Sequence, residues 1–68
     1  MSQHDIVLEH LKEHGSISSM EAFKKYYITR LAAVIFDLRA DGYEIETDMV
    51  SKKRRNGDRV RYAVYTLL

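Results

Sequence analysis

Hydrophobic residues recur at helical spacing near the start of the chain, over residues 3–14. The repeating positions are Val7, Leu8 and Leu11. Ser2 can cap this segment at its start, with Asp5 three residues later, and Gly15 stands where a left-handed cap ends a helix. We therefore expect a helix over residues 3–14. Ile17, between two serines, then lies in a short extended piece that can form a strand.

A second helical segment begins at Ser18, which forms a capping box with Glu21, and it ends near KYYI at residues 25–28. Its apolar side chains can face the core while its lysines face the solvent. The inward set is Met20, Phe23 and Tyr27, and the outward set is Lys24 and Lys25. The pattern predicts a short amphipathic helix.

A third helical pattern starts with Thr29 as its expected N-cap and reaches Gly42, a C-cap glycine. Its core stripe repeats at helical spacing and consists of Leu31, Ile35 and Leu38. The opposite face holds Arg30, Ala33, Asp37 and Ala40, with Phe36 at its edge. Val34 and Phe36 lie off the stripe, and two interpretations are open: they pack beneath the hairpin or the second helix, or they mark a protein-binding patch. For Phe36 we expect packing, because a small domain rarely leaves a phenylalanine free.

From residue 43 onward the period changes to that of strands, first in YEIETDMV and later in VRYAVYTLL. Between them, Asn56–Gly57 predicts a hairpin with a two-residue type I′ turn. That turn would pair Arg55 with Asp58, Arg54 with Arg59, Lys53 with Val60 and Lys52 with Arg61. Two of these pairs oppose like charges, which costs roughly 0.2–1 kcal/mol each. A polyanionic partner would remove that repulsion.

The charge of the chain is divided between its two parts. Its 68 residues have a formal net charge of +1, contain no cysteine and are 46% hydrophobic, which suits one globular domain over residues 1–68. Residues 1–50 carry five Lys and Arg against nine Asp and Glu, a balance of −4. Residues 51–68 carry six Lys and Arg against one Asp, a net charge of +5. The split predicts that the C-terminal part binds an anionic partner.

The order of helix, short strand, helix, turn, helix and hairpin is that of a winged helix-turn-helix, an α+β fold whose third strand would be the piece near Ile17. Residues 11–47 resemble a small helix-turn-helix domain common in phage and prophage proteins of bacteria. The resemblance rests on the glycine, SIS and EA of residues 15–22 and on a third-helix motif. The motif matches Arg30, Leu31, Ala32, Ala33, Ile35, Asp37, Leu38, Arg39, Gly42, Tyr43 and Ile45. It implies a winged DNA-binding fold, with one departure: Val34 stands where many relatives carry a cation.

This resemblance implies roles for the polar residues. Arg30, at the start of the third helix, can pair bidentately with guanine O6 and N7 in the major groove. Asp37 can accept from cytosine N4, or it can hold Arg30 or Arg39 in place. Phosphate contacts are expected from the wing cations Lys52, Lys53, Arg54, Arg55, Arg59 and Arg61, which could also enter the minor groove. The alternative is that a charged, twisted hairpin tip serves to discourage edge-to-edge aggregation. The remaining candidates are Ser19, at a helix N-terminus, Lys24 and Lys25, for which a solvated face is the alternative, and Thr29 and Ala33 on the third helix.

The leading functional hypothesis is sequence-specific binding of double-stranded DNA by a phage- or prophage-type regulator or architectural recombination factor. The helix at residues 29–41 would lie in the major groove and the wing at residues 51–61 on the backbone. The alternative is a protein-interaction module that binds and inhibits a host protein. A single domain makes a small DNA interface, so a homodimer or adjacent copies on DNA are expected.

Other classes of protein are not favoured by the sequence. No catalytic constellation is visible, so we expect neither an enzyme nor a cofactor. His10 and His14 are four residues apart, but this pair lacks the ligand count of a zinc site. No apolar run approaches the length of a membrane span, and no signal peptide is visible. We therefore expect a cytoplasmic protein, associated with the nucleoid or, if phage-encoded, in the host-cell cytoplasm.

Overall fold

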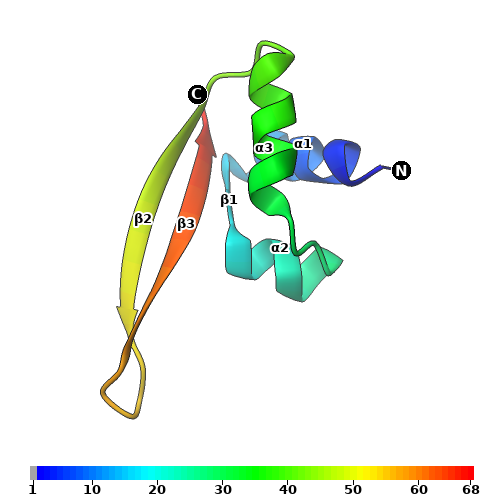
Figure 1. Cartoon of the computed structure of the whole chain (residues 1–68). Helices are drawn as coiled ribbons and strands as arrows, with labels where there is room; N and C mark the ends of the chain where they lie inside the picture. Colours follow the sequence, from blue (N-terminus) through cyan, green and yellow to red (C-terminus); the bar gives the residue numbers. More distant parts are fainter. Residues whose placement is uncertain (1) are drawn as a thin grey trace.

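The computed structural model describes residues 2–68, which form three helices and a three-stranded antiparallel sheet (Figure 1). The elements are α1 (Gln3–His14), β1 (Ser16–Ser18), α2 (Ser19–Tyr26), α3 (Leu31–Ala40), β2 (Ile45–Lys53) and β3 (Arg59–Leu67). The sheet order is β1-β3-β2, so the predicted short strand at Ile17 pairs with the hairpin. The expected winged helix-turn-helix architecture is confirmed.

The predicted caps of the first two helices are confirmed. At the start of α1, the Asp5 N–H donates to Ser2 Oγ at 3.2 Å, and Gly15 ends the helix in the left-handed region at φ 85°. At the start of α2, the Ser18 and Glu21 side chains each accept from the other residue's backbone N–H, which completes the capping box. These bonds depend only on local sequence, which is why the pattern located both helices.

A single cluster of buried hydrophobic residues joins α1, β1, α2, α3 and the base of the hairpin. It consists of Val7, Leu11, Ile17, Ala22, Ile28, Leu31, Val34, Ile35, Leu38, Ile45 and Tyr65. The predicted α3 stripe is confirmed. The prediction that Val34 lies off the stripe is wrong: Val34 is buried, because it completes the i, i+3, i+4, i+7 face that begins at Leu31. A cation at that position would be buried in the core.

The predicted inward face of α2 is wrong. Met20, Phe23 and Tyr27 are all exposed, whereas Ala22 is fully buried and Tyr26 is half-buried. The helix packs on the core through the small side chain of Ala22 and, one turn later, through Tyr26. The core-facing side of α2 therefore excludes Met20 and Phe23. The outward orientation of Lys24 and Lys25 is confirmed.

The predicted ends of α3 also need correction. The helix spans residues 31–40 rather than 29–41, and Arg30, not Thr29, occupies its N-cap position without a side-chain cap bond. Asp41 closes the other end, and Gly42 follows it at φ 103°, a conformation that suits glycine. The expected glycine stop is therefore found one residue beyond the cap.

The hairpin turn differs from the prediction by one residue. The strands pair Lys53 with Arg59, Lys52 with Val60 and Ser51 with Arg61. Only Gly57 in the loop has a positive φ, at 92°, whereas a type I′ turn also requires one at Asn56. The Gly57 N–H donates to Arg54 O at 3.1 Å and the Arg54 N–H to Asp58 O at 2.7 Å.

The loop therefore contains three residues, Arg55 to Gly57, closed by a turn with glycine at its left-handed position. This register leaves one opposed like-charge pair, Lys53 with Arg59, instead of the two predicted. The hairpin extends well beyond the packed end, and the molecule measures 40 × 22 × 20 Å (Figure 1). Within residues 2–68, no helix is long and apolar enough to cross a membrane.

Candidate nucleic-acid interface

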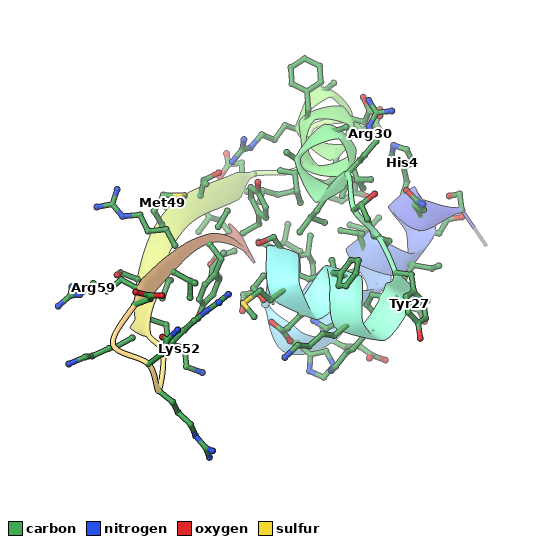
Figure 2. The ribbon with its side chains drawn as sticks, turned by 60° about the horizontal axis from the view of Figure 1, so that its bottom comes forward. His4, Tyr27, Arg30, Met49, Lys52 and Arg59 are labelled. Carbon is green, nitrogen blue, oxygen red and sulfur yellow. The ribbon has the colours of Figure 1, made fainter. Side chains whose placement is uncertain are left out.

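The distal part of the hairpin, residues 51–61, is called the wing. Every residue of the wing is exposed except Val60, which is half-buried. Its cations are Lys52, Lys53, Arg54, Arg55, Arg59 and Arg61. The strands place these side chains around the tip on both faces of the hairpin, and Figure 2 shows Lys52 and Arg59 at the hairpin end of the molecule. The sequence prediction of a concentrated basic surface is therefore matched by the fold.

The wing cations have no acidic partner in the described part of the chain. Across residues 2–68, no lysine or arginine nitrogen lies within 4.0 Å of a carboxylate oxygen. The one acidic residue of the wing, Asp58, accepts from Asn56 Nδ2 at 3.1 Å, while the Asp58 N–H donates to Asn56 Oδ1 at 3.1 Å. Asp58 thus shapes the loop and leaves the positive charge of the wing uncompensated.

A groove separates the wing from the N-terminus of α2, and we call it the wing groove. Its volume is about 620 Å³. It is lined by Ser19, Met20, Lys52, Lys53, Arg54, Arg55, Val60, Arg61 and Tyr62. The walls are cationic, and Met20, Val60 and Tyr62 supply apolar surface between them. This composition suits an extended anion with apolar parts, such as a nucleic-acid strand.

A smaller neighbouring pocket of about 240 Å³ connects α2 to the same surface. Lys24 and Lys25 line it together with Lys52 and Tyr62. A third pocket also has Ser19 in its lining, together with Thr29, just before α3, and Ala32 in the first turn of that helix. Ser19 therefore lies where the wing groove meets the α2–α3 junction, and the fold brings most predicted site residues to one continuous surface.

The outer face of α3 carries the rest of the predicted residues. Arg30 is exposed at the beginning of the helix, and Ala33 and Asp37 are exposed on later turns. In the view of Figure 2, Arg30 lies at α3, and Lys52 and Arg59 lie at the hairpin end of the molecule. Phe36 is 71% exposed, so the expectation that it packs beneath the hairpin is wrong.

The proposed pairing of Asp37 with Arg30 or Arg39 is also wrong for the described side chains. His4, from α1, donates from Nε2 to Asp37 Oδ2 at 2.7 Å. Arg39 instead donates from Nε to the Ile45 carbonyl at 2.9 Å and from Nη2 to Thr47 Oγ1 at 2.7 Å. Asp37 thus ties α3 to α1, and Arg39 ties α3 to the first residues of β2.

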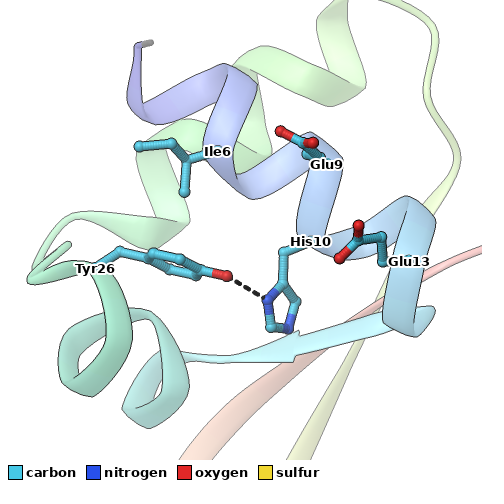
Figure 3. A pocket seen from close by; sticks show the side chains of 5 residues that line it. All are labelled: Ile6, Glu9, His10, Glu13 and Tyr26. Carbon is cyan, nitrogen blue, oxygen red and sulfur yellow. Dashed lines mark hydrogen bonds between the residues drawn. The ribbon is translucent and has the colours of Figure 1, made fainter.

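A second polar feature lies apart from the wing, around the buried side chain of His10 (Figure 3). Nδ1 of His10 and the Tyr26 hydroxyl share a hydrogen bond of 2.8 Å, which joins α1 to α2. Nε2 of His10 is buried without a well-aligned hydrogen bond in the described chain, and Glu21 Oε2 lies 3.8 Å from it.

Burial lowers the pKa of His10 below 6.5, and the positive charges of His14 and Lys25 add to this, while Glu21 and the Ser16 backbone oppose it. Within residues 2–68, no group of three possible metal ligands is assembled. The contact that the structure shows for His10 is its hydrogen bond with Tyr26, which links α1 to α2.

Three residues of this surface are not predictable from the sequence pattern. Met20 and Tyr62 join the wing groove, and His4 makes a hydrogen bond with Asp37. The position of Met20 fits a helical apolar stripe, which favours the core over the surface. The contacts of Tyr62 and His4 join segments far apart in the chain, so no local pattern could identify them.

Comparison with protein-family models matches residues 2–68 to the winged helix-turn-helix domain family, and the chain belongs to that family. The match covers almost the whole chain and agrees with the three helices and the three-stranded antiparallel sheet. Winged helix-turn-helix domains are typically non-enzymatic DNA-binding domains, so the family membership suggests DNA as the partner. A search of curated proteins found no match.

Proposed function

We propose that this chain is a sequence-specific double-stranded DNA-binding protein, acting as a small transcriptional regulator or an architectural recombination factor of phage or prophage type. In this proposal α3 lies in the major groove and the wing contacts the backbone. The phage or prophage assignment is supported by the motif in residues 11–47. A place in the cytoplasm, on the nucleoid or on phage DNA, goes with that role.

The observation that carries the proposal is the wing itself. Six cations project from one hairpin without a carboxylate within 4.0 Å in the described chain. Holding like charges together weakens an isolated hairpin, and the repulsion is relieved when phosphates neutralise them. The wing groove extends this charge to the N-terminus of α2, where backbone N–H groups can bind a phosphate of the DNA.

Specificity would come from the other part of the surface. Arg30 is exposed, has no bond to a carboxylate in the described chain and stands at the N-terminal end of α3, the end that reaches base edges in helix-turn-helix proteins. A guanidinium there can pair bidentately with guanine. In this proposal Arg30 would contact a base and supply sequence specificity, and the wing would contact phosphates and supply affinity for any duplex.

The test is the salt dependence of duplex binding by the full chain. A cognate site is first selected from a random duplex pool, and its dissociation constant is measured by fluorescence anisotropy over a series of salt concentrations. Six or more phosphate contacts predict roughly a thousandfold weaker binding between about 50 and 200 mM salt. A chain that binds no duplex at low salt, or binds with little salt dependence, would contradict the proposal.

A second candidate function is supported by α3. The outer face of this helix presents the exposed Phe36 and carries Asp37 as well as Arg30, which is a weak basic surface for a recognition helix. A protein-interaction module that binds and inhibits a host protein would use Phe36 as its anchor. Val34 gives this alternative no support, because its side chain is buried and a cation there could not reach DNA. Binding that depends on Phe36 but little on salt would favour this alternative.

A further inference from the structure

The outer face of α3 is apolar along its middle and polar at both edges. At about 100° per residue, Phe36 lies between Arg39 on the hairpin side and Asp37 on the α1 side. Ala33 and Ala40 share this face and are exposed, as is the Phe36 ring. The Phe36 ring is the largest apolar group on this face, and its exposure makes it accessible to a partner.

The polar groups at the edges of this face are already engaged within the fold. Asp37 accepts a hydrogen bond from His4, and Arg39 donates to Ile45 O and Thr47 Oγ1. Arg39 cannot reach a base edge without breaking its contacts with β2, whereas Asp37 uses Oδ2 for His4 and, within residues 2–68, keeps Oδ1 free at the edge of the face. The middle of α3, between these edges, therefore offers hydrocarbon to a partner, and Arg30 stands at its N-terminal end.

Charge complementarity selects the partner. The uncompensated cations of the wing, together with Arg30, favour a polyanion over a neutral protein surface. Within the major groove of DNA, base edges present hydrogen-bond donors and acceptors, and the apolar feature is the C5 methyl group of thymine. Alanine and phenylalanine side chains are suited to contact that methyl group.

We propose that Phe36, with Ala33 and Ala40 beside it, contacts thymine C5 methyl groups in the major groove and so determines part of the sequence preference. This inference rests on the proposed function and adds the base class that the middle of α3 reads. Arg30 precedes Phe36 by six residues, about 9 Å along a helix. A guanine read by Arg30 and a thymine read by Phe36 would therefore lie about two to three base pairs apart, at about 3.4 Å each.

The experiment removes the methyl group and nothing else. Each thymine of the selected duplex is replaced in turn by deoxyuridine, which lacks the C5 methyl but keeps the same hydrogen-bonding groups. Fluorescence anisotropy at one fixed salt concentration gives the dissociation constant of the full chain for every duplex. At the contacted thymine we expect about fourfold weaker binding, which corresponds to about 0.8 kcal/mol for one buried methyl-sized group.

Variants identify the side chain that is responsible. Phe36→Ala should bind the thymine and deoxyuridine duplexes equally, because its ring no longer covers the methyl group. Met49→Ala is the matched control: Met49 is 65% exposed but lies on β2, so this variant should keep the full preference for thymine. The deoxyuridine series on the unmodified chain needs no variant, so its result holds even if Phe36→Ala lowers the melting temperature.

The results that overturn this inference differ from those that overturn the proposed function. Equal affinity for thymine and deoxyuridine at every position, in a chain that binds duplex DNA, excludes the Phe36 contact and leaves DNA binding in place. A thymine preference that survives in Phe36→Ala also excludes it. A chain that binds no duplex overturns the proposed function itself, and the inference with it.

Discussion

The packed end of the molecule and the wing differ in what their side chains contact. At the packed end, apolar residues from the three helices, β1 and the base of the hairpin bury one another in a single cluster. In the wing almost every side chain is exposed, and the six cations have no carboxylate within 4.0 Å in residues 2–68. The packed end satisfies its own contacts, whereas the wing presents charges that only a partner can neutralise.

The same contrast divides α3 along its length. Its inner face, with Ile35 only 1% exposed, belongs to the core, and its outer face, with Phe36 71% exposed, belongs to the candidate interface. Ile35 and Phe36, which are neighbours in the sequence, thus face different surroundings: one faces the core and the other faces solvent. The inner residue is determined by packing, and the outer residue is free to serve a partner.

The largest effect is expected from that pair of neighbours. Ile35→Ala leaves a cavity in the core and should lower the free energy of unfolding by about 2–5 kcal/mol, much of what so small a domain has. Phe36→Ala should stay within about 0.5 kcal/mol of the unmodified chain, because its side chain is exposed. Thermal melts of both variants measure this difference, and equal destabilisation would mean that the outer face of α3 is covered in the folded chain.

Arg30→Ala should cost about 1–3 kcal/mol of binding free energy on the selected site and little on a random duplex, because a base contact carries sequence information. Arg59→Ala, on the wing, is the matched control and should weaken binding to both duplexes by the same factor. Anisotropy titrations on the two duplexes make the comparison. An equal effect of Arg30→Ala on both would reassign Arg30 to the phosphate backbone.

Acid should weaken the packed end through His10. Burial holds the pKa of folded His10 below its unfolded value of 6.5, so the unfolded chain binds the proton more readily. Above about pH 6.5, His10 is neutral in both states and does not lower the stability. Below that pH, the free energy of unfolding should fall by at most about 1.4 kcal/mol per pH unit, because the unfolded chain takes up the proton first. The other charged or titratable side chains around His10 are Glu9, Glu13 and His14 of α1 and Glu21 and Lys25 of α2.

Urea unfolding between about pH 8 and pH 5 measures this dependence. His10→Gln should show a shallower decline with acid than the unmodified chain, and His4→Gln, at the partly exposed hydrogen bond with Asp37, should retain it. An identical decline in His10→Gln would assign the acid sensitivity to other groups.

The smallest effect concerns the turn between α2 and α3. Tyr27 has a left-handed backbone with φ 56°, and its side chain is 80% exposed. A non-glycine residue in the left-handed region strains the folded chain by about 1–2 kcal/mol, and glycine removes this strain. Glycine also increases the conformational entropy of the unfolded chain, which lowers the free energy of unfolding by about 0.4–1 kcal/mol. Tyr27→Gly should therefore raise the free energy of unfolding by about 0.5 kcal/mol. Tyr27→Ala should not, and a gain in both would exclude backbone strain as the cause.

Features that depend on neighbouring residues were predictable from the sequence. Ser2, Gly15 and the pair Ser18 and Glu21 make their cap contacts within a few residues, so their positions defined the first two helices. The clustering of the wing cations needed no structure to be seen. The hairpin register could not be derived in the same way, because Asn-Gly fits both a two-residue and a three-residue loop, and the choice depends on the φ of Asn56.

Burial was harder to predict, because hydrophobicity alone does not say which partner covers a side chain. Phe36 and Met20 have the composition of core residues but lie on surfaces that the chain leaves open. Ala22 is fully buried although its small side chain gave no signal. The contact between His4 and Asp37 joins residues 33 positions apart, and only the folded chain brings them together.

The most direct test of the difference between the packed end and the wing is the salt slope of DNA binding after Lys53, Arg54 and Arg55 are all replaced by alanine. These residues are exposed and line the wing groove, so the variant should keep the melting temperature of the unmodified chain. Lys12→Ala, an exposed cation on α1 that lines neither the wing groove nor the neighbouring pocket, serves as the control.

The affinity of the triple variant should fall by about the same factor on the selected and random duplexes. Its slope of log affinity against log salt should be shallower by about 0.9 for each phosphate that the variant no longer neutralises, whereas Lys12→Ala should keep the slope of the unmodified chain. A triple variant that keeps both the affinity and the salt slope of the unmodified chain would show that the wing does not bind the backbone, and would contradict the role proposed for it.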